Sequence, residues 1–290
     1  MNATLTGALA RLCRTRRGKR LTGRIDRFVA PRIPQTGTSV ADFGRRRKIR
    51  CDLAIEYDRS VYLGREEFVE LQLIARLLAR GDTFVDCGAN IGLFTVFGAD
   101  LVGPNGCVIA VEPVAPTFTR LQENVELSRV TDRVRLLHHA LAAESDEVVG
   151  LAGDEHNGMR VTDGTGSIDF QSTTITLDRV LEDVPDVAGL KIDVEGYEIQ
   201  VLRGAETTIR RHSPWILIEF NSQIAGTDDL RGWDVHGLLT AHGYVAHLPR
   251  SLAGGDAAPI STAWRNPRAY TNLLYWPVTR DAIGRAMPSR

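Results

Sequence analysis

A glycine-rich turn between two apolar segments is the first stretch of this sequence that could do chemistry. Residues 83–96 read TFVDCGANIGLFTV, in which an apolar run ends in Asp86 and apolar residues resume after a turn. The turn residues are Gly88, Ala89, Asn90 and Gly92. The pattern predicts a strand, a tight turn and a helix start, with glycine where the backbone takes positive φ or lies against a ligand. A turn of this kind also occurs in ordinary strand-to-helix connections.

A carboxylate downstream of the turn points to a nucleoside ligand. Residues 106–113 predict a second buried strand that ends in Glu112, at the separation where a mononucleotide-binding unit places a carboxylate on ribose hydroxyls. Asn90 stands where the dinucleotide fingerprint has its second glycine, and the acidic Asp86 disfavours a phosphate beside the turn. We therefore predict S-adenosylmethionine as the cofactor, with Glu112 at its ribose and Asp86 at its methionine end.

Six motifs, taken in their order and spacing, resemble the FkbM-type methyltransferases. They are DCGANIG at 86–92, VEP at 111–113, TLDRVL at 176–181, KIDVEGYE at 191–198, VLRGA at 201–205 and IEF at 218–220. The resemblance extends over roughly residues 50–277. It implies a class I, Rossmann-like fold and S-adenosylmethionine-dependent methylation of a hydroxyl, commonly on a sugar or polyketide. It does not name the acceptor.

Two further strands are predicted to bring more carboxylates to the same sheet edge. Ligands of open α/β sheets bind beyond the carboxyl ends of the strands, so a strand at 190–193 places Asp193 and Glu195 for chemistry. Lys191 shares a face with Asp193 and needs either an ion-pair partner or a substrate role. A hydroxyl acceptor must lose its proton, and we predict Asp193, then Glu195, as the base, oriented by Lys191 or by Glu219 at the end of the next strand.

Other rim residues allow more than one interpretation. After a third strand at 134–138, His139 and Ala140 lie where adenine commonly sits in such folds, although His138 and His139 also fit as solvated strand-end residues. The carboxylates on the rim could together bind Mg²⁺, which takes oxygen ligands. We predict no metal, because Glu112 and Asp86 are assigned to the cofactor.

The remaining elements follow from periodicity and turn signals. Alternating strands and helices predict a central, mostly parallel sheet with an antiparallel C-terminal strand. One or two strands are expected in 49–64, helices in 65–81, 115–127, 197–209 and 234–241, and closing strands in 243–247 and 272–277. The polar segment 153–167 is either an acceptor-binding lid or a mobile insertion. In the loop at 251–270, Trp264 and Tyr270 either stack on a sugar or pack on the sheet.

Charge divides the chain into a basic N-terminal extension, 1–49, and a methyltransferase domain, 50–290. Residues 1–50 carry 14 basic and two acidic residues, whereas the remaining 240 carry 21 basic and 34 acidic residues. The extension has an interrupted helical apolar stripe and no apolar core long enough for a signal peptide or membrane span. Three interpretations of the extension stay open: it lies on anionic lipid, it packs over the acidic domain, or it is a disordered tail. Its arginine-rich, acid-poor composition also resembles that of an organelle transit peptide.

Composition narrows the partners and the compartment. The chain offers no recognised nucleic-acid-reading module, so no nucleic acid partner is predicted. Its four cysteines have neither disulfide nor metal spacing, which favours a reducing cytoplasm. The sequence does not indicate an oligomeric state. Two other function classes stay open: an NAD-dependent oxidoreductase, disfavoured by Asn90, and a non-catalytic S-adenosylmethionine-binding protein tethered by the basic extension.

Overall fold

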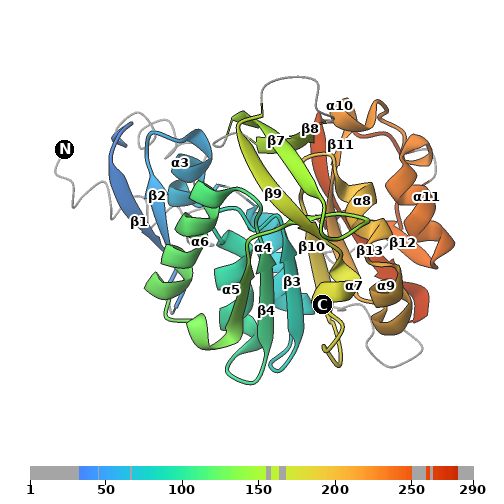
Figure 1. Cartoon of the computed structure of the whole chain (residues 1–290), viewed down its shortest axis with the longest axis horizontal. Coiled ribbons are helices and arrows are strands. Elements are labelled where there is room, and N and C mark those ends of the chain that lie inside the picture. The colour runs from blue at the N-terminus through green and yellow to red at the C-terminus, as the bar shows by residue number, and fades with distance from the viewer. Residues whose placement is uncertain are drawn as a thin grey trace.

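A seven-stranded sheet forms the centre of the computed structural model (Figure 1). The structure describes residues 33–44, 46–65, 67–154, 158–162, 168–249, 259–261 and 264–279. The strand order is β12-β13-β11-β10-β3-β4-β5. Its strands are β3 (Thr83–Cys87), β4 (Cys107–Val111), β5 (Val134–Leu137), β10 (Gly189–Ile192), β11 (Trp215–Asn221), β12 (Tyr244–His247) and β13 (Tyr270–Pro277).

The strand directions confirm the predicted sheet. β5, β4, β3, β10 and β11 are parallel, whereas β13 runs antiparallel to both β11 and β12. The parallel strands are short apolar runs because helices cover both of their faces. All four residues of β10 are buried, Lys191 included. All parallel strands therefore present their carboxyl ends at one edge, which β13 reaches with its first residues.

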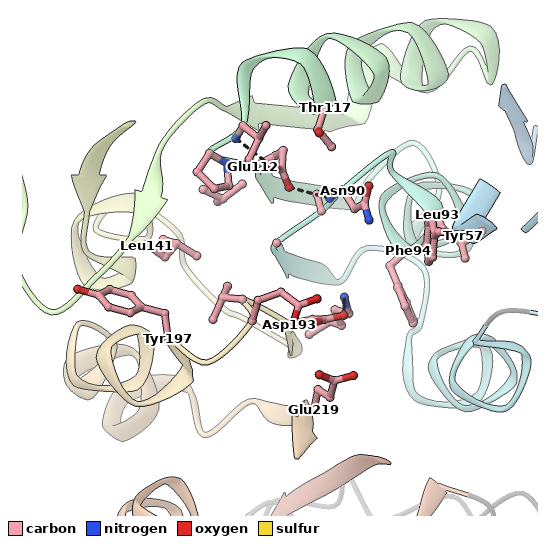
Figure 2. A pocket seen from close by; sticks show the side chains of 18 of the residues that line it. Tyr57, Asn90, Leu93, Phe94, Glu112, Thr117, Leu141, Asp193, Tyr197 and Glu219 are labelled. Carbon is pink, nitrogen blue, oxygen red and sulfur yellow. Dashed lines mark hydrogen bonds and ion pairs between the residues drawn. The ribbon is translucent and has the colours of Figure 1, made fainter. Parts of the chain in front are cut away.

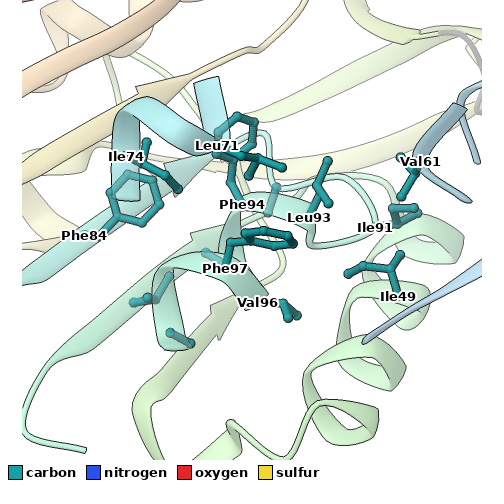
Figure 3. Close-up of a cluster of buried hydrophobic side chains, with 14 of the residues drawn as sticks. Ile49, Val61, Leu71, Ile74, Phe84, Ile91, Leu93, Phe94, Val96 and Phe97 are labelled. Atoms are coloured by element: carbon teal, nitrogen blue, oxygen red, sulfur yellow. The ribbon is translucent and has the colours of Figure 1, made fainter. Parts of the chain in front are cut away.

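Helices on the two faces of the sheet enclose two apolar cores. They are α3 (Glu56–Leu63), α4 (Phe68–Leu77), α5 (Leu93–Val102), α6 (Ala115–Leu127), α7 (Leu177–Val180), α8 (Glu198–Arg203), α9 (Glu206–His212), α10 (Ser222–Ala225) and α11 (Asp234–Ala241), with short 3₁₀ turns at Thr131–Arg133 and Leu230–Gly232. One core joins the first four of these helices to the sheet, and Figure 3 shows part of it around Phe94 and Phe97. The other core lies under α8, α9 and α11. None of the described helices is long and apolar enough to span a bilayer.

The N-terminal part of the described chain differs from the prediction. Strands β1 (Thr38–Asp42) and β2 (Lys48–Asp52) form a hairpin, and residues 56–63, predicted as strand, form helix α3. The helix begins with acidic residues and ends at Gly64 in the left-handed conformation, which are helix signals that the alternating pattern concealed. Strand β1 lies before the domain boundary predicted at 49 and 50. The predicted helical extension at 1–32 lies outside the described residues.

The segment predicted as a polar lid contains an unexpected strand. A second sheet has the order β6-β9-β7-β8 and is made of β6 (Ala140–Leu141), β7 (Val148–Asp154), β8 (Gly158–Thr162) and β9 (Phe170–Ile175). Residues 155–157 and 163–167 of the lid lie outside the described residues. The helix predicted at 197–209 is divided into α8 and α9 at Gly204, where an added Cβ would lie 2.1 Å from the carbonyl oxygen of Ala142.

Candidate functional site

A cavity of about 500 Å³ opens at the carboxyl ends of the parallel strands (Figure 2). This volume is within the usual range for small-molecule sites. The lining comes from the turns after β3, β4 and β5, from the β10–α8 connection, and from α3, the start of α4, β11 and β13. The sheet edge that the sequence predicted to carry the chemistry is therefore the place where the structure has its pocket.

Glu112 connects two of these turns through backbone hydrogen bonds. Its Oε2 accepts the N–H of Asn90 at 2.9 Å, and its Oε1 accepts the N–H of Val114 at 3.0 Å. Only 6% of the residue is exposed, and burial raises the pKa of Glu112 to about 7 despite these two donors. Each carboxylate oxygen can accept a further hydrogen bond. The position and bonding of Glu112 fit the predicted ribose contact.

The glycine turn is held against its neighbours by backbone contacts. The N–H groups of Gly88 and Ala89 both donate to the carbonyl oxygen of Val111 at 3.0 Å. Gly88 has φ +77, and a Cβ added there would lie 1.8 Å from the backbone oxygen of Asp193. The glycine at this position is thus required by the approach of β3 to the end of β10. Gly88, Ala89 and Asn90 line the pocket as predicted.

Two predicted cofactor residues do not line this pocket. Gly92, with φ +89, faces Leu121 of α6, whose Cδ1 would lie 2.6 Å from an added Cβ. Asp86 is fully buried, and its Oδ2 accepts the hydroxyl of Thr95 at 2.6 Å. Burial raises the pKa of Asp86, while the charge of Lys191 opposes that rise. Asp86 does not line the cavity, and its predicted contact with the methionine end stays a prediction.

The predicted adenine end is only partly as expected. His139 and Ala140 line the pocket. His138 instead packs beside Phe118, with ring centroids 5.0 Å apart, and its Nε2 lies 3.0 Å from the carbonyl oxygen of Pro113. Burial, and then the neighbouring His138, lower the pKa of His139. An uncharged imidazole next to the small Ala140 side chain is compatible with a neutral aromatic base.

Lys191 forms the ion pair that its position in a buried strand demands. Its Nζ lies 2.9 Å from Oδ2 of Asp193 and 5.0 Å from the centre of the Phe94 ring, and only 4% of the residue is exposed. Burial lowers the pKa of Lys191, but the negative charges of Asp193 and Glu67 outweigh it and raise the pKa overall. The ammonium therefore remains charged and holds the Asp193 carboxylate at the rim of the pocket.

Glu195 and Glu219 lie in the same pocket as this ion pair. Figure 2 shows Asp193 between Glu112 on one side and Glu219 on the other. Burial, and then the negative charges of Asp193 and Glu195, raise the pKa of Glu219 to about 9. Its surroundings therefore favour the protonated form of Glu219, which can donate a hydrogen bond.

Backbone strain is concentrated around the pocket. Three pocket-lining residues other than glycine have positive φ: Glu67 at 48°, Asn90 at 50° and Glu195 at 52°. Such conformations are uncommon outside glycine and often mark ligand sites. Asn90 and Glu195 belong to the two motifs that carried the chemical prediction. Glu67 was not predicted.

Sequence reasoning missed most of the pocket wall opposite the cofactor turns. The missed residues are Glu56, Tyr57 and Ser60 of α3, Glu67 before α4, Phe94, Tyr197, Asn221 and Asn272. Helix α3 is fixed by the buried Asp58, which pairs with Arg120 of α6 and accepts the N–H of Asp52 at 2.6 Å. Tyr270 lines the pocket, whereas Trp264 packs near Phe220 with ring centroids 6.4 Å apart. Among the described residues no group of three or more His, Cys, Asp or Glu is arranged to hold a metal ion.

The fold and the pocket define a class of protein. The sheet is mostly parallel and has one antiparallel strand, β13, next to β11. The Glu112 carboxylate follows directly after β4. Together these features are the class I, Rossmann-like methyltransferase architecture. The model of the family described as the methyltransferase FkbM domain matches residues 86–246. The chain belongs to the FkbM methyltransferase family.

Several known proteins are similar to this chain. The hexuronic acid methyltransferase AglP of Haloferax volcanii is 27% identical over 161 residues, which are 54% of this chain and 64% of the relative. Methyltransferase 1 of Beauveria bassiana is 31% identical over 150 residues, or 43% of this chain and 59% of the relative. The chain thus spans about three fifths of the length of these relatives. The solved structure of an FkbM methyltransferase from Methylobacillus flagellatus is 16% identical, with a TM-score of 0.43, over 75% of this chain and 54% of that one.

Proposed function

We propose that the protein is an S-adenosylmethionine-dependent O-methyltransferase that acts on a hydroxyl of a small molecule or glycan. One observation carries the proposal: a single cavity holds both the Glu112 carboxylate and the Lys191–Asp193 ion pair. We assign the first to the ribose of the cofactor and the second to the proton of the acceptor. The name of the Haloferax relative points in the same direction, because hexuronic acids are sugar derivatives with hydroxyl groups.

The residues present fit S-adenosylmethionine. Glu112 would accept hydrogen bonds from the ribose hydroxyls, since each of its oxygens has spare acceptor capacity. His139 and Ala140 would flank the adenine, and the backbone of 88–90 would line the approach to the sugar. The cofactor supplies an electrophilic methyl group on a sulfonium centre. An acidic pocket suits a ligand that carries this positive charge.

The side chains of this protein would position the acceptor and take its proton. Methyl transfer is a displacement, so alignment of the acceptor oxygen accounts for much of the rate. Asp193 is our proposed base, and the Nζ of Lys191, which donates to its Oδ2 at 2.9 Å, orients it. Glu195 is the second choice. Glu219, in its protonated form, is proposed to donate a hydrogen bond to the acceptor and thereby to orient it.

Two measurements test this function. Isothermal titration should show binding of S-adenosylmethionine and S-adenosylhomocysteine and no binding of NAD. Transfer of the methyl group from labelled S-adenosylmethionine to a panel of hydroxyl compounds should then give an alkali-stable ether product. Binding of NAD in place of S-adenosylmethionine would contradict the cofactor assignment. Binding without transfer to any acceptor would instead favour a non-catalytic role.

A further inference from the structure

The antiparallel pairing of β11 with β13 places four polar or aromatic side chains in one row at the pocket. Glu219 is directly opposite Asn272, and Asn221 is directly opposite Tyr270. Residues that face each other across two strands project from the same side of the sheet, and residues two apart in a strand do so as well. All four residues line the pocket. The register therefore assembles a carboxyl group, two carboxamides and a phenol ring along one face.

The row continues a buried apolar face out to the pocket. One step deeper in the sheet, Leu217 is opposite Leu274, and both are fully buried. Glu219, Asn221 and Asn272 are partly buried, and Tyr270, at the end of the row, is 62% exposed. Polar side chains thus begin where the pocket begins, and a large aromatic ring faces solvent at its rim.

This combination of groups suits a sugar ring. Carboxamides carry both donors and acceptors, as vicinal hydroxyl groups do, and a carboxyl group adds a further partner. A tyrosine ring offers a flat apolar face for the C–H side of a pyranose and a hydroxyl at its edge. The Asn221 Oδ1 already accepts the N–H groups of Gln223 and Ile224 at the start of α10, which leaves its NH₂ group to donate to a ligand. An apolar polyketide chain would give no partner to the Asn272 carboxamide or to the Glu219 carboxyl group, which is costly in a closed site.

The charges on the same wall exclude one kind of sugar. Glu56, Glu67 and Glu195 line the same pocket as the Lys191–Asp193 pair. Among the described lining residues Lys191 is the lone lysine or arginine, and Asp193 already neutralises it at 2.9 Å. A carboxylate on the acceptor would find no free counter-ion among the described lining residues, and an unpaired charge in a pocket is strongly disfavoured.

We propose that the β11–β13 row, Glu219, Asn221, Tyr270 and Asn272, is a binding subsite for a pyranose ring without a carboxylate. The acceptor of this enzyme is then the hydroxyl of a neutral sugar and not of a uronic acid. This inference rests on the proposed function, since the sugar hydroxyl is the group methylated in the same pocket. It adds the identity of the acceptor class and the residues that select it.

Saturation-transfer NMR on the full-length protein tests the subsite with simple probes. Methyl glucopyranoside, methyl mannopyranoside and methyl galactopyranoside are each compared with the matching methyl uronide, with and without saturating S-adenosylhomocysteine. We expect ring-proton signals from at least one neutral glycoside and at least about fivefold weaker apparent affinity for its uronide, as ~1 kcal/mol of repulsion gives. Equal or tighter binding of the uronide, or no signal from any neutral glycoside, overturns the proposal.

Variants separate this subsite from the cofactor site. Tyr270→Ala should abolish the glycoside signal, Tyr270→Phe should keep most of it, and Asn272→Ala should weaken it. Val278→Ala is the matched control, because Val278 is exposed just beyond the end of β13 and does not line the pocket. Affinity for S-adenosylhomocysteine, measured by titration, should be the same in all four variants.

The outcomes distinguish the two proposals. If S-adenosylhomocysteine binds but Tyr270→Ala leaves the glycoside signal unchanged, the sugar subsite is wrong and the methyltransferase function stands. If S-adenosylhomocysteine does not bind at all, the proposed function fails, while the experiment without it still reports on the subsite.

Discussion

The two ends of the pocket are built in different ways. The cofactor end consists of turns after β3, β4 and β5, held by backbone hydrogen bonds such as those from Gly88, Ala89 and Asn90. The acceptor end consists of side chains from α3, the start of α4, β11 and β13. Most of these segments lie outside residues 86–246, which match the family model. In the proposed function, the cofactor end would therefore depend largely on backbone geometry, whereas the acceptor end would depend on side chains that can change while the backbone stays.

The two ends also differ in the surroundings of their buried carboxyl groups, and therefore in the pKa values of these groups. Glu112 accepts two backbone N–H groups, which oppose the effect of burial and leave its pKa at about 7. For the Glu219 carboxyl group, no hydrogen bond from the described residues opposes the effect of burial. The nearby negative charges of Asp193 and Glu195 add to that effect, so the pKa of Glu219 reaches about 9. One carboxyl group is poised to accept hydrogen bonds and the other to donate one.

The largest effect is expected at Gly88, where the two ends touch. Gly88→Ala places a Cβ 1.8 Å from the backbone oxygen of Asp193. In addition, the positive φ of this residue costs alanine about 1–2 kcal/mol of stability. Gly243→Ala is the matched control, with φ +79 and no atom within 4 Å of the added Cβ. We expect Gly88→Ala to lose both cofactor binding and much of the free energy of unfolding, measured by titration and by urea denaturation. Equal behaviour of the two variants would show that the contact between the ends is unimportant.

Asp193→Asn should separate chemistry from binding. The substitution keeps the shape but removes the proposed base, so single-turnover methylation should fall by roughly a hundredfold or more while S-adenosylmethionine affinity stays nearly constant. Glu195→Gln should have a smaller effect on the same rate. A loss of cofactor affinity in Asp193→Asn would move Asp193 to the binding end and make Glu195 the preferred base.

Glu112→Ala should affect the cofactor end alone. The variant removes the ribose contacts and leaves the N–H groups of Asn90 and Val114 without their acceptor. We expect S-adenosylmethionine binding to weaken by about 1.5–3 kcal/mol in calorimetry. Glu219→Gln, at the other end, should leave this affinity unchanged. A similar loss in both variants would show that the two ends are not separable.

The smallest effect is expected from pH. If ionised Glu112 is the form that accepts the ribose hydroxyls, S-adenosylmethionine affinity should rise about tenfold between pH 6 and pH 8, around the pKa of about 7. Because this pKa is raised above its unfolded value, the same group stabilises the cofactor-free fold below pH 4.5 and loses that contribution as the pH rises through 7. The affinity profile should flatten in Glu112→Gln. An unchanged profile in that variant would assign the titration to another group.

The sequence by itself was sufficient for the elements that form the proposed cofactor end, although not for the positions of Asp86 and Gly92. Strands β3, β4 and β10, the turn at 88–90 and the carboxylate of Glu112 were predicted because each depends on a short, local pattern of apolar residues, glycine and acid. The six motifs also identified the family. The fold class followed, since alternating strands and helices leave few other topologies.

Only the tertiary structure decided the acceptor end. Helix α3 was read as strand, and its contact with the pocket depends on Asp58 reaching Arg120, 62 residues away in the chain. The burial of Asp86 and the alignment of Glu219 with Asn272 depend on packing against α5 and on the register between strands. A shift of one residue in that register would turn the whole row to the other face of the sheet. Such long-range distances and registers are set by packing of the entire core, and no local sequence pattern encodes them.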